Sequence, residues 1–344
     1  MATHANESDR NQNYTMTDAS KVAADLIRRE IWASEGKAFE LPEELKLIAK
    51  QVQQLDLSRM PLTLDVLESL VDALPNLLEV NLFSTDVTVK ELALLSRLKY
   101  LQYLSLGCCE HLDDAAVASL APCQNLKYLT LEKTPITGTT LSKLPNSIEE
   151  LILWDCLQLI DEGVAGLAAM HHLKILNLRG TPITGAFLSE LPDSLQTLNL
   201  WNCSCLTDAG LAHLATKRHI KDLNVGDTLV KGTSFAYLPD SLEILNCEFC
   251  RELGDDALAG LASKKNLKTL ILERTSITGK TLGLLPPSIE ILDCSSCAKL
   301  TDESLKELVK MPNLKKLSLF FCRHISDETV DFLRKALPLT QIEH

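Results

Sequence analysis

Apolar and polar residues alternate along this chain in short stretches that predict β-strands with one buried face. The stretches share the pattern L-x-x-L-x-L-x-x-[CT], with Ile, Val or Cys in place of some leucines. One series starts at positions 148, 195, 242 and 289, always 47 residues apart. A second series with the same step starts at 126, 173, 220, 267 and 314. Together with starts at 52, 77 and 101, these give twelve repeats, and a half repeat follows at 337–342.

The segments between the strands predict helices of two lengths. After CSC at 203–205, the sequence LTDAGLAHLA offers Thr207 as an N-cap and places Asp208 in the first helical turn. Repeats of the other series continue as TPITGAFLSELPDS (181–194), where Gly and Pro limit the helix to a turn or two. One repeat cannot bury its own leucines, so we expect stacking of the repeats to supply the core.

The N-terminal region differs from the repeats. Residues 17–35 predict an amphipathic helix with Val22, Leu26 and Ile31 on one side, and Pro42 opens a second helix. We therefore expect a disordered polar tail at 1–16, a helical N-terminal cap at 17–51, and a solenoid of twelve repeats plus a terminal half repeat at 52–344.

The repeats resemble the leucine-rich repeat family over about residues 52–342. Their C-x-x-L-T-D-x-x-L form is similar to the cysteine-containing subclass of F-box adaptor proteins and of some bacterial effectors, although every second central repeat has Thr in place of Cys or Asn. The resemblance implies an α/β solenoid: a right-handed leucine-rich-repeat horseshoe with a parallel β-sheet on the concave face and a convex side that alternates between helix and short helix. LPEEL at 41–45 is also similar to the start of an F-box, but the first repeat at 52 leaves no space for the rest.

The composition argues against some classes of partner and indicates a cellular compartment. The formal charge of −12 argues against nucleic acid or an anionic membrane as the main partner, because both need a basic surface. The sequence contains no apolar run long enough for a membrane span, and residues 1–16 lack the apolar stretch of a cleavable signal. Eleven cysteines, an odd number, favour reduced thiols in a cytoplasm. The alternative is export, without a cleaved signal, into a host-cell cytosol. We expect a monomer without a cofactor.

Two CxxC pairs have the spacing of a zinc site, at Cys247 and Cys250 and at Cys294 and Cys297. The pairs are two repeats apart, roughly 10 Å at the spacing of adjacent strands, which is too far for four thiolates on one ion. We therefore expect free cysteines and no metal site. His171 and His172 lie in a predicted turn without a partner residue, and no phosphate-binding or catalytic motif occurs.

The strand residues that face away from the core form columns across the repeats. The column after the last inward strand residue contains Ser58, Phe83, Gly107, Glu132, Trp154, Arg179, Trp201, Gly226, Glu248, Glu273, Ser295 and Phe320. Two of the three tryptophans fall in it, with an arginine between them, and Trp and Arg are enriched at binding hot spots. We predict that these side chains are exposed on the concave face and contact a partner. The predicted binding residues are Trp154, Arg179, Trp201, Asp155, Asn177, Asn199, Glu132, Glu248 and Phe249.

The functional hypothesis is a non-enzymatic protein-binding module that recognises a protein partner on its concave face. The resemblance leaves two settings open: a bacterial virulence effector acting in a host cell, and a substrate-recognition adaptor of a ubiquitin ligase. The alternative from another class is an enzyme or enzyme regulator with an acidic concave site at Glu132, Asp155, Asp227 and Glu248. No pairing of a base with a nucleophile supports that alternative.

Overall fold

The computed structural model describes residues 18–34 and 40–344, which form two compact units. Unit 1 contains the described residues up to Leu159 together with 169–173, and unit 2 contains 160–168 and 174–344. Each unit is described by itself. The polar tail expected at 1–16 lies outside the described residues.

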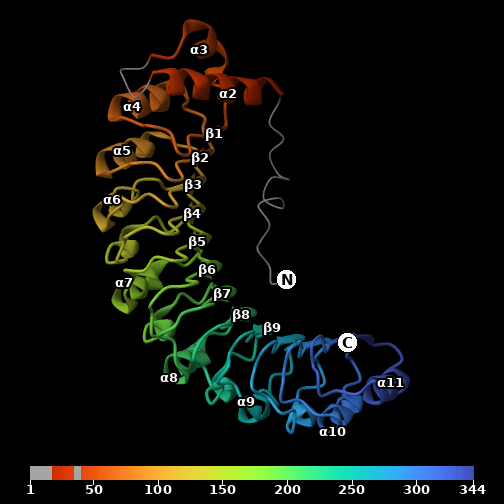
Figure 1. Ribbon diagram of the computed structural model, residues 1–344. Helices are drawn as coiled ribbons and strands as arrows, with labels where there is room; N and C mark the ends of the chain where they lie inside the picture. Colours follow the sequence, from red (N-terminus) through yellow and green to blue (C-terminus); the bar gives the residue numbers. More distant parts are fainter. Residues whose placement is uncertain (1–17, 35–39) are drawn as a thin grey trace. The chain divides into compact units, whose positions relative to one another are not determined.

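Unit 1 contains parallel strands that pair in chain order (Figure 1). The central residue of each strand faces the core, as Leu104 and Leu129 do, and these central residues pair in register. Helices α4 to α6 lie on the opposite side from the strands in Figure 1. The strands are β1 (Gln54–Asp56), β2 (Glu79–Asn81), β3 (Tyr103–Ser105), β4 (Tyr128–Thr130) and β5 (Glu150–Ile152), and the helices are α2 (Asp18–Ala33), α3 (Glu43–Ala49), α4 (Leu64–Ala73), α5 (Val89–Leu94) and α6 (Asp114–Ala118), with 3-10 helices η1 (Leu95–Arg97) and η2 (Leu141–Lys143).

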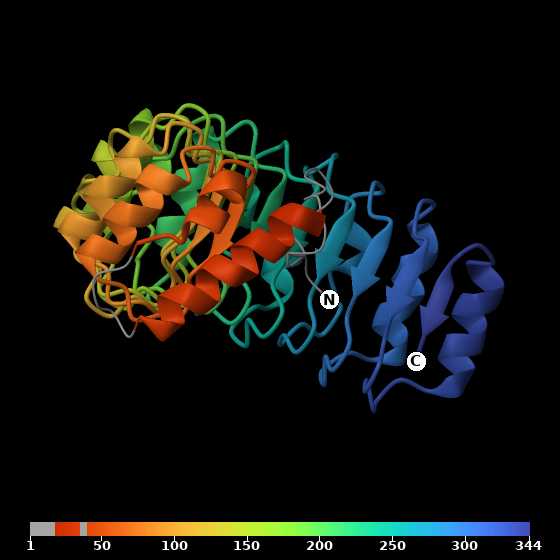
Figure 2. The same cartoon turned by 90° about the horizontal axis from the view of Figure 1, so that it is seen from above.

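Unit 2 continues the same alternation, and its strands also pair in parallel and in chain order. Figure 2 shows its last strands (blue) side by side. The strands are β6 (Ile175–Asn177), β7 (Thr197–Asn199), β8 (Asp222–Asn224), β9 (Ile244–Asn246), β10 (Thr269–Ile271), β11 (Ile291–Asp293), β12 (Lys316–Ser318) and β13 (Gln341–Glu343). The α-helices are α7 (Asp161–Ala165), α8 (Asp208–Leu211), α9 (Asp255–Gly260), α10 (Asp302–Leu305) and α11 (Asp327–Ala336), and the 3-10 helices are η3 (Gly166–Ala169), η4 (Leu188–Glu190), η5 (Ala212–Thr216), η6 (Phe235–Tyr237), η7 (Leu282–Leu284) and η8 (Lys306–Lys310). The predicted fold class is confirmed: an α/β solenoid with a parallel sheet. Its helical side alternates between α-helices and three-residue 3-10 segments from α6 to α10, whereas successive repeats carry α4, α5 and α6 before that stretch.

The Thr and Cys positions of neighbouring repeats share one backbone carbonyl. The Thr181 hydroxyl donates to the Leu178 carbonyl at 2.5 Å, and the Cys203 thiol of the next repeat donates to the same oxygen at 3.1 Å. A carbonyl oxygen has two lone pairs, so it accepts both bonds. The same arrangement occurs at the carbonyls of Leu82, Leu131, Val225 and Leu272. Both residue types therefore bond to the loop backbone, which gives a reason for their alternation.

A second set of hydrogen bonds joins neighbouring repeats on the helical side. The carboxylate of Asp255 accepts from the Thr278 N–H, the Thr278 hydroxyl and the Gly279 N–H of the next repeat. Gly279 adopts a φ of 84°, a conformation that favours glycine, and its amide is held by this carboxylate. Equivalent bonds reach the carboxylates of Asp114 and Asp161, and the Asp208 carboxylate accepts from the Lys231 N–H and the Ser234 N–H. The aspartate at the start of the α-helix in these repeats therefore holds the turn of the following repeat.

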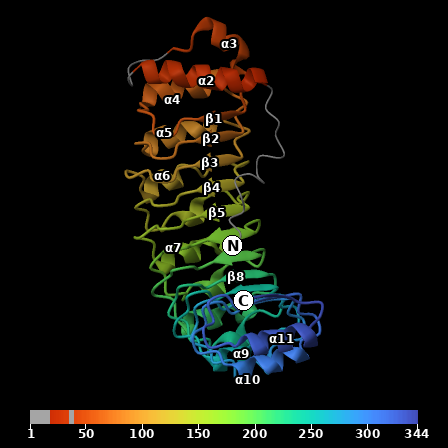
Figure 3. The same ribbon diagram turned by 45° about the vertical axis from the view of Figure 1, so that its right-hand side comes forward.

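Two sequence expectations about helices need correction. Thr207 precedes α8, but its side chain forms no cap hydrogen bond there. In α2, Ile27 and Ile31 are fully buried, whereas Val22 and Leu26 are 56% and 37% exposed. The side of α2 that packs against the rest of unit 1 therefore differs from the side that the spacing of Val22, Leu26 and Ile31 predicts. Figure 3 shows α2 lying next to α4 and β1, and the Ser20 hydroxyl donates to the Gln51 carbonyl ahead of β1.

Two lysines lie inside unit 2 rather than on its surface. Lys217 is 7% exposed, and its ammonium donates to the Leu191 carbonyl at 2.5 Å and lies 3.6 Å from the Asp193 carboxylate. Lys264 is 3% exposed and makes the equivalent contacts with Leu238 and Asp240. A buried ammonium needs such partners, because desolvation disfavours an isolated charge. Lys217 is therefore not an exposed residue of the helical side.

We expect the Cys/Thr column to be more sensitive to substitution than the outer strand positions. Cys203→Asp places an uncompensated charge in the core and should lower the free energy of unfolding by about 3 kcal/mol or more. Asn199→Asp should cost less than about 0.5 kcal/mol, because an aspartate oxygen still accepts the Trp201 N–H. Urea unfolding of the two variants checks this contrast. Equal losses of stability would show that the inside and outside assignments are wrong.

Lys217 should be replaceable by methionine, which other repeats have at the equivalent position. Met170 and Met311 occupy the position equivalent to Lys217, and Asn146 and Pro287 replace the aspartate in those cases. Lys217→Met should therefore stay within about 1 kcal/mol of wild type or be stabilising, since apolar replacement of a buried ion pair is often neutral or better. Lys217→Ala, which leaves a void, should cost about 2 kcal/mol. Thermal or urea unfolding compares them; an alanine variant as stable as the methionine variant would contradict this interpretation.

Candidate protein-binding surface

The side of the parallel sheet turned away from the helices, which we call the sheet face, carries the predicted columns. Inward leucines alternate along each strand with outward residues, so the asparagines at the strand ends lie on this face. The Asn177 side-chain oxygen accepts the Arg179 N–H at 3.0 Å, and the Asn199 oxygen accepts the Trp201 N–H at 2.9 Å. Asn224 and Asn246 make the same bond to Gly226 and Glu248. Asn177 and Asn199, predicted to bind a partner, therefore also fix the backbone that presents Arg179 and Trp201.

In every repeat, the residue directly after the column of Trp154, Arg179 and Trp201 has a left-handed backbone conformation. Positive φ values near 57° occur at Asp155, Phe249 and Arg274, among others, and Gly180 has 68°. The amides of most of these residues continue the sheet ladder, as the Phe249 N–H does by donating to the Glu273 carbonyl at 2.8 Å. Bulky residues adopt this conformation at an energetic cost, and such strained positions cluster at binding sites.

In unit 1, Trp154 is half-buried rather than exposed as predicted. The Lys133 ammonium lies 4.6 Å from the centroid of its ring, within cation–π distance. Arg59 makes a similar contact with Phe83 at 6.0 Å. Lys133 and Arg59 are both exposed, so each aromatic ring of these pairs is covered on one side by a cation that also reaches solvent.

In unit 2, Trp201 is the centre of a continuous series of aromatic and cationic side chains. The Arg179 guanidinium lies 5.9 Å from the Trp201 ring, and the Trp201 and Phe249 rings meet edge to face at 6.0 Å. Arg274 lies over Phe249 at 4.6 Å. Gly226 leaves space for the indole, because a Cβ there would lie 2.4 Å from the Trp201 ring. We call Arg179, Trp201, Phe249 and Arg274 the aromatic row.

Carboxylates lie beside the aromatic row. Burial raises the pKa of Glu248 above its usual range, and the nearby carboxylates of Glu273 and Asp293 raise it further. Burial also raises the pKa of Asp222, which starts β8 on the same face. Arg274 lies 3.7 Å from Glu273 and partly offsets this charge. Several carboxylates therefore lie on the sheet face of unit 2 next to its aromatic side chains.

The structure brings some of the predicted residues together and adds others. Arg179, Trp201 and Phe249 are in contact as a series, which the column positions predicted only for the first two. Lys133, Gly226 and Arg274 were missed as site residues, although Lys133 and Arg274 occupy the left-handed column next to the predicted one. Trp154, Asp155 and Glu132 belong to unit 1, so their grouping with Arg179 and Trp201 stays a prediction.

The comparison with solved structures identifies the fold. The chain is similar to the crystal structure of an internalin (inlF) from Listeria monocytogenes, with a TM-score of 0.60 and 17% identity, over 97% of this chain and 98% of that chain. This chain has the leucine-rich-repeat fold. The plant peptide hormone receptor RGFR1 in complex with RGF2 matches 81% of this chain and 58% of that chain, with a TM-score of 0.46 and 15% identity. No protein-family model and no curated protein matches the sequence.

The cysteines of the leucine-rich repeats are free thiols in the structure. Burial raises the pKa of Cys203 and of Cys297 to about 11, and their thiols donate to backbone carbonyls. Cys247 and Cys294 are fully buried, and burial raises the pKa of each well above its usual range. Among residues 18–34 and 40–344, no group of three or more His, Cys, Asp or Glu side chains is placed to hold a metal ion.

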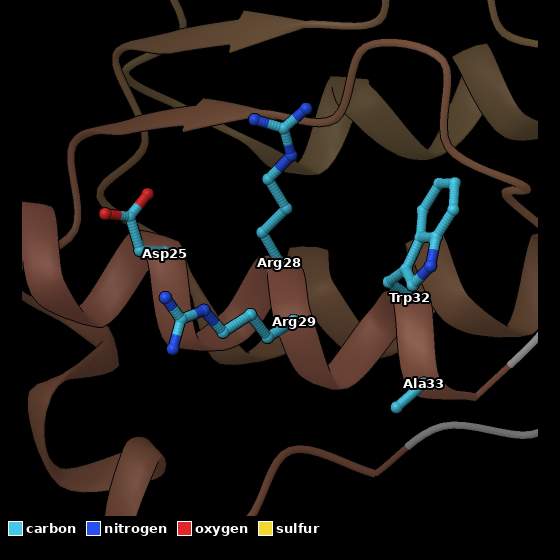
Figure 4. A pocket seen from close by; sticks show the side chains of 5 residues that line it. All are labelled: Asp25, Arg28, Arg29, Trp32 and Ala33. Atoms are coloured by element: carbon cyan, nitrogen blue, oxygen red, sulfur yellow. The ribbon is translucent and has the colours of Figure 1, made fainter.

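A shallow pocket lies on the N-terminal helix α2 of unit 1. It has a volume of about 640 Å³ and is lined by Asp25, Arg28, Arg29, Trp32 and Ala33, which project from α2 in Figure 4. Arg28 also forms an ion pair with Asp56 at 3.5 Å. In the part of the chain that the structure describes, no helix is both long and apolar enough to span a bilayer.

We expect the thiols to differ sharply in reactivity. Cys205 is exposed, whereas the carbonyl-bonded thiols such as Cys156 are fully buried, and thiolates are the reactive form. In the native protein, a thiol reagent should label Cys205 first and leave Cys109, Cys156, Cys203, Cys250 and Cys297 unlabelled. Mass spectrometry of the labelled peptides tests this, and all eleven cysteines should react after denaturation. Fewer reactive thiols in the denatured protein, or stoichiometric zinc, would contradict the free-thiol assignment.

Proposed function

We propose that this protein is a non-enzymatic protein-binding module that holds a protein partner on its sheet face. The observation that carries the proposal is the aromatic row of unit 2, in which two arginines stack on Trp201 and Phe249. Trp and Arg supply much of the binding energy at protein interfaces, particularly where they are held in fixed positions. Asn199, Gly226 and the leucine core hold Trp201 in place before any partner binds.

The stacked cations stabilise each half-buried aromatic side chain even when no partner is bound. A cation over an exposed ring contributes ~0.5–1 kcal/mol, and more when a partner displaces the surrounding water. Arg179 keeps its guanidinium exposed, and the planar fork suits a partner carboxylate. Trp154 with Lys133 offers a second contact point of the same kind in unit 1.

Two biological settings remain proposals. One is a bacterial effector that acts in a host-cell cytosol, and the other is an adaptor that presents substrates to a ubiquitin ligase. The similarity to an internalin supports the fold in both cases and does not choose between them. An enzyme or enzyme regulator with an acidic sheet face is the alternative from another class. A group of carboxylates without a nucleophile offers it little support.

Binding should depend on the aromatic row. Arg179→Ala and Trp201→Ala should each weaken partner binding by about 2 kcal/mol or more, the size expected of hot spots. Their effect on folding should be small, because neither side chain belongs to the leucine core. A pull-down from host-cell or native lysate with wild type, followed by calorimetry with the identified partner, measures the losses.

The matched control is Tyr237→Ala, which removes a 61% exposed aromatic side chain from η6 on the helical side. Its affinity should equal that of wild type. Gly226→Ala provides a second test, because its Cβ displaces the indole without removing it. The proposal fails if a partner binds the Trp154→Ala, Trp201→Ala double variant as tightly as wild type. It also fails if that double replacement unfolds the protein, since both side chains would then be core residues.

A further inference from the structure

We infer that the sheet face of unit 2 around β9 to β11 binds a lysine or arginine side chain of the partner protein, between Glu248, Glu273 and Asp293 and the aromatic rings of Trp201 and Phe249. This inference rests on the proposed function and specifies the chemistry of the partner. We call the three carboxylates the acidic triad.

The first support is an excess of negative charge that this face does not neutralise. Among the residues that the structure describes, Arg274 is the cation of the acidic triad, and it pairs with Glu273. Elsewhere in unit 2, carboxylates near the strand starts are paired: Glu243 lies 3.3 Å from Lys221 and 2.9 Å from Lys268. Like charges on neighbouring strands repel, so an added cation at the triad gains attraction and relieves this repulsion.

The second support is a buried donor on the same face. Asn246 is 2% exposed, and its side-chain oxygen accepts the Glu248 N–H at 2.8 Å. Its side-chain NH₂ group has no hydrogen-bond partner among the described residues. Leu245 and Cys247 are fully buried in the core, so the alternation of the strand directs Asn246 and Glu248 to the sheet face. An unpaired buried donor is costly, and a peptide carbonyl next to the bound cation would satisfy it.

The third support is that the rings beside the triad already accept guanidinium groups. Arg179 and Arg274 of the protein itself stack on Trp201 and Phe249 at 5.9 and 4.6 Å. An organic cation also fits the spacing better than a metal ion. The described residues contain no group of carboxylates close enough for a metal, whereas a guanidinium has five N–H donors and can reach several separate acceptors.

The test uses the full-length protein and a fluorescein-labelled GGRGGRGG peptide, with fluorescence anisotropy at about 50 mM salt so that screening is modest. The arginine peptide should bind, and the same peptide with citrulline in place of both arginines should bind at least about tenfold more weakly. The Glu248→Gln, Glu273→Gln variant should lose about tenfold or more in affinity for the arginine peptide. In NMR spectra, the Asn246 side-chain amide resonances should shift with the arginine peptide and not with the citrulline peptide.

The matched control is Glu252→Gln, Glu328→Gln, which makes the same change in charge at two exposed positions of unit 2 outside the triad. It should stay within about twofold of wild type. Equal losses in the two variants, or equal binding of the two peptides, would overturn the inference. Circular dichroism confirms that each variant is folded. If the natural partner binds the triad variant normally but fails to bind Trp201→Ala, the cation site is wrong and the proposed function still stands.

Discussion

The sharing of one backbone carbonyl by a threonine hydroxyl and the cysteine thiol of the next repeat sets the order in which these repeats stack. Because the carbonyl of Leu178 accepts from both Thr181 and Cys203, a threonine repeat is completed by a cysteine repeat. On the helical side, the aspartate of a cysteine repeat such as Asp255 then holds the turn of the next threonine repeat. The two kinds of interface alternate, which gives a physical reason for a period of two repeats. The last cysteine, Cys322, lacks a threonine before it and donates to the Cys294 carbonyl instead.

This stacking gives the binding surface its rigidity. The residues that present Trp201 are its own strand, the Asn199 side chain and the Gly226 backbone, and none of them needs a partner to be ordered. A surface of this kind loses little conformational entropy on binding. Its charge is also uneven: the exposed guanidinium of Arg179 stands at one end of the aromatic row, and Glu248, Glu273 and Asp293 lie at the other. A partner with complementary charges would therefore be oriented as well as attracted.

The periodic part of the structure followed from the sequence, and the contacts between side chains did not. Leucine spacing predicted the strands and their inward faces, because these depend on which residues avoid water. The positions of Gly and Pro predicted the alternation of helix lengths, because these residues end helices. Burial of Lys217 was not predictable, since a lysine at an apolar position signals a polar partner only once Leu191 and Asp193 are seen beside it. The exposed Val22 and Leu26 show the same limit, because several apolar residues of α2 compete for one buried side.

Trp154 and Trp201 show that residue spacing predicts the face on which a side chain lies but not how exposed it is. Their column on the sheet face was correct, but their exposure was overestimated, because Lys133 and Arg179 lie across the rings. These cations come from the preceding repeat. Such pairs depend on side-chain conformation, which alternation along a strand does not determine.

The left-handed residue at the end of each strand has a consequence for how such a protein can change over time. Glycine and asparagine adopt this conformation at little cost, and Gly180 and Asn202 occupy it in two repeats. Phe249, Arg274 and Phe321 hold the same conformation with bulky side chains. Selection for stability alone would favour glycine or asparagine at these positions. Such replacements would remove Phe249 and Arg274 from the aromatic row. Thermostable descendants of this sequence would be poorer binders unless binding itself were kept under selection.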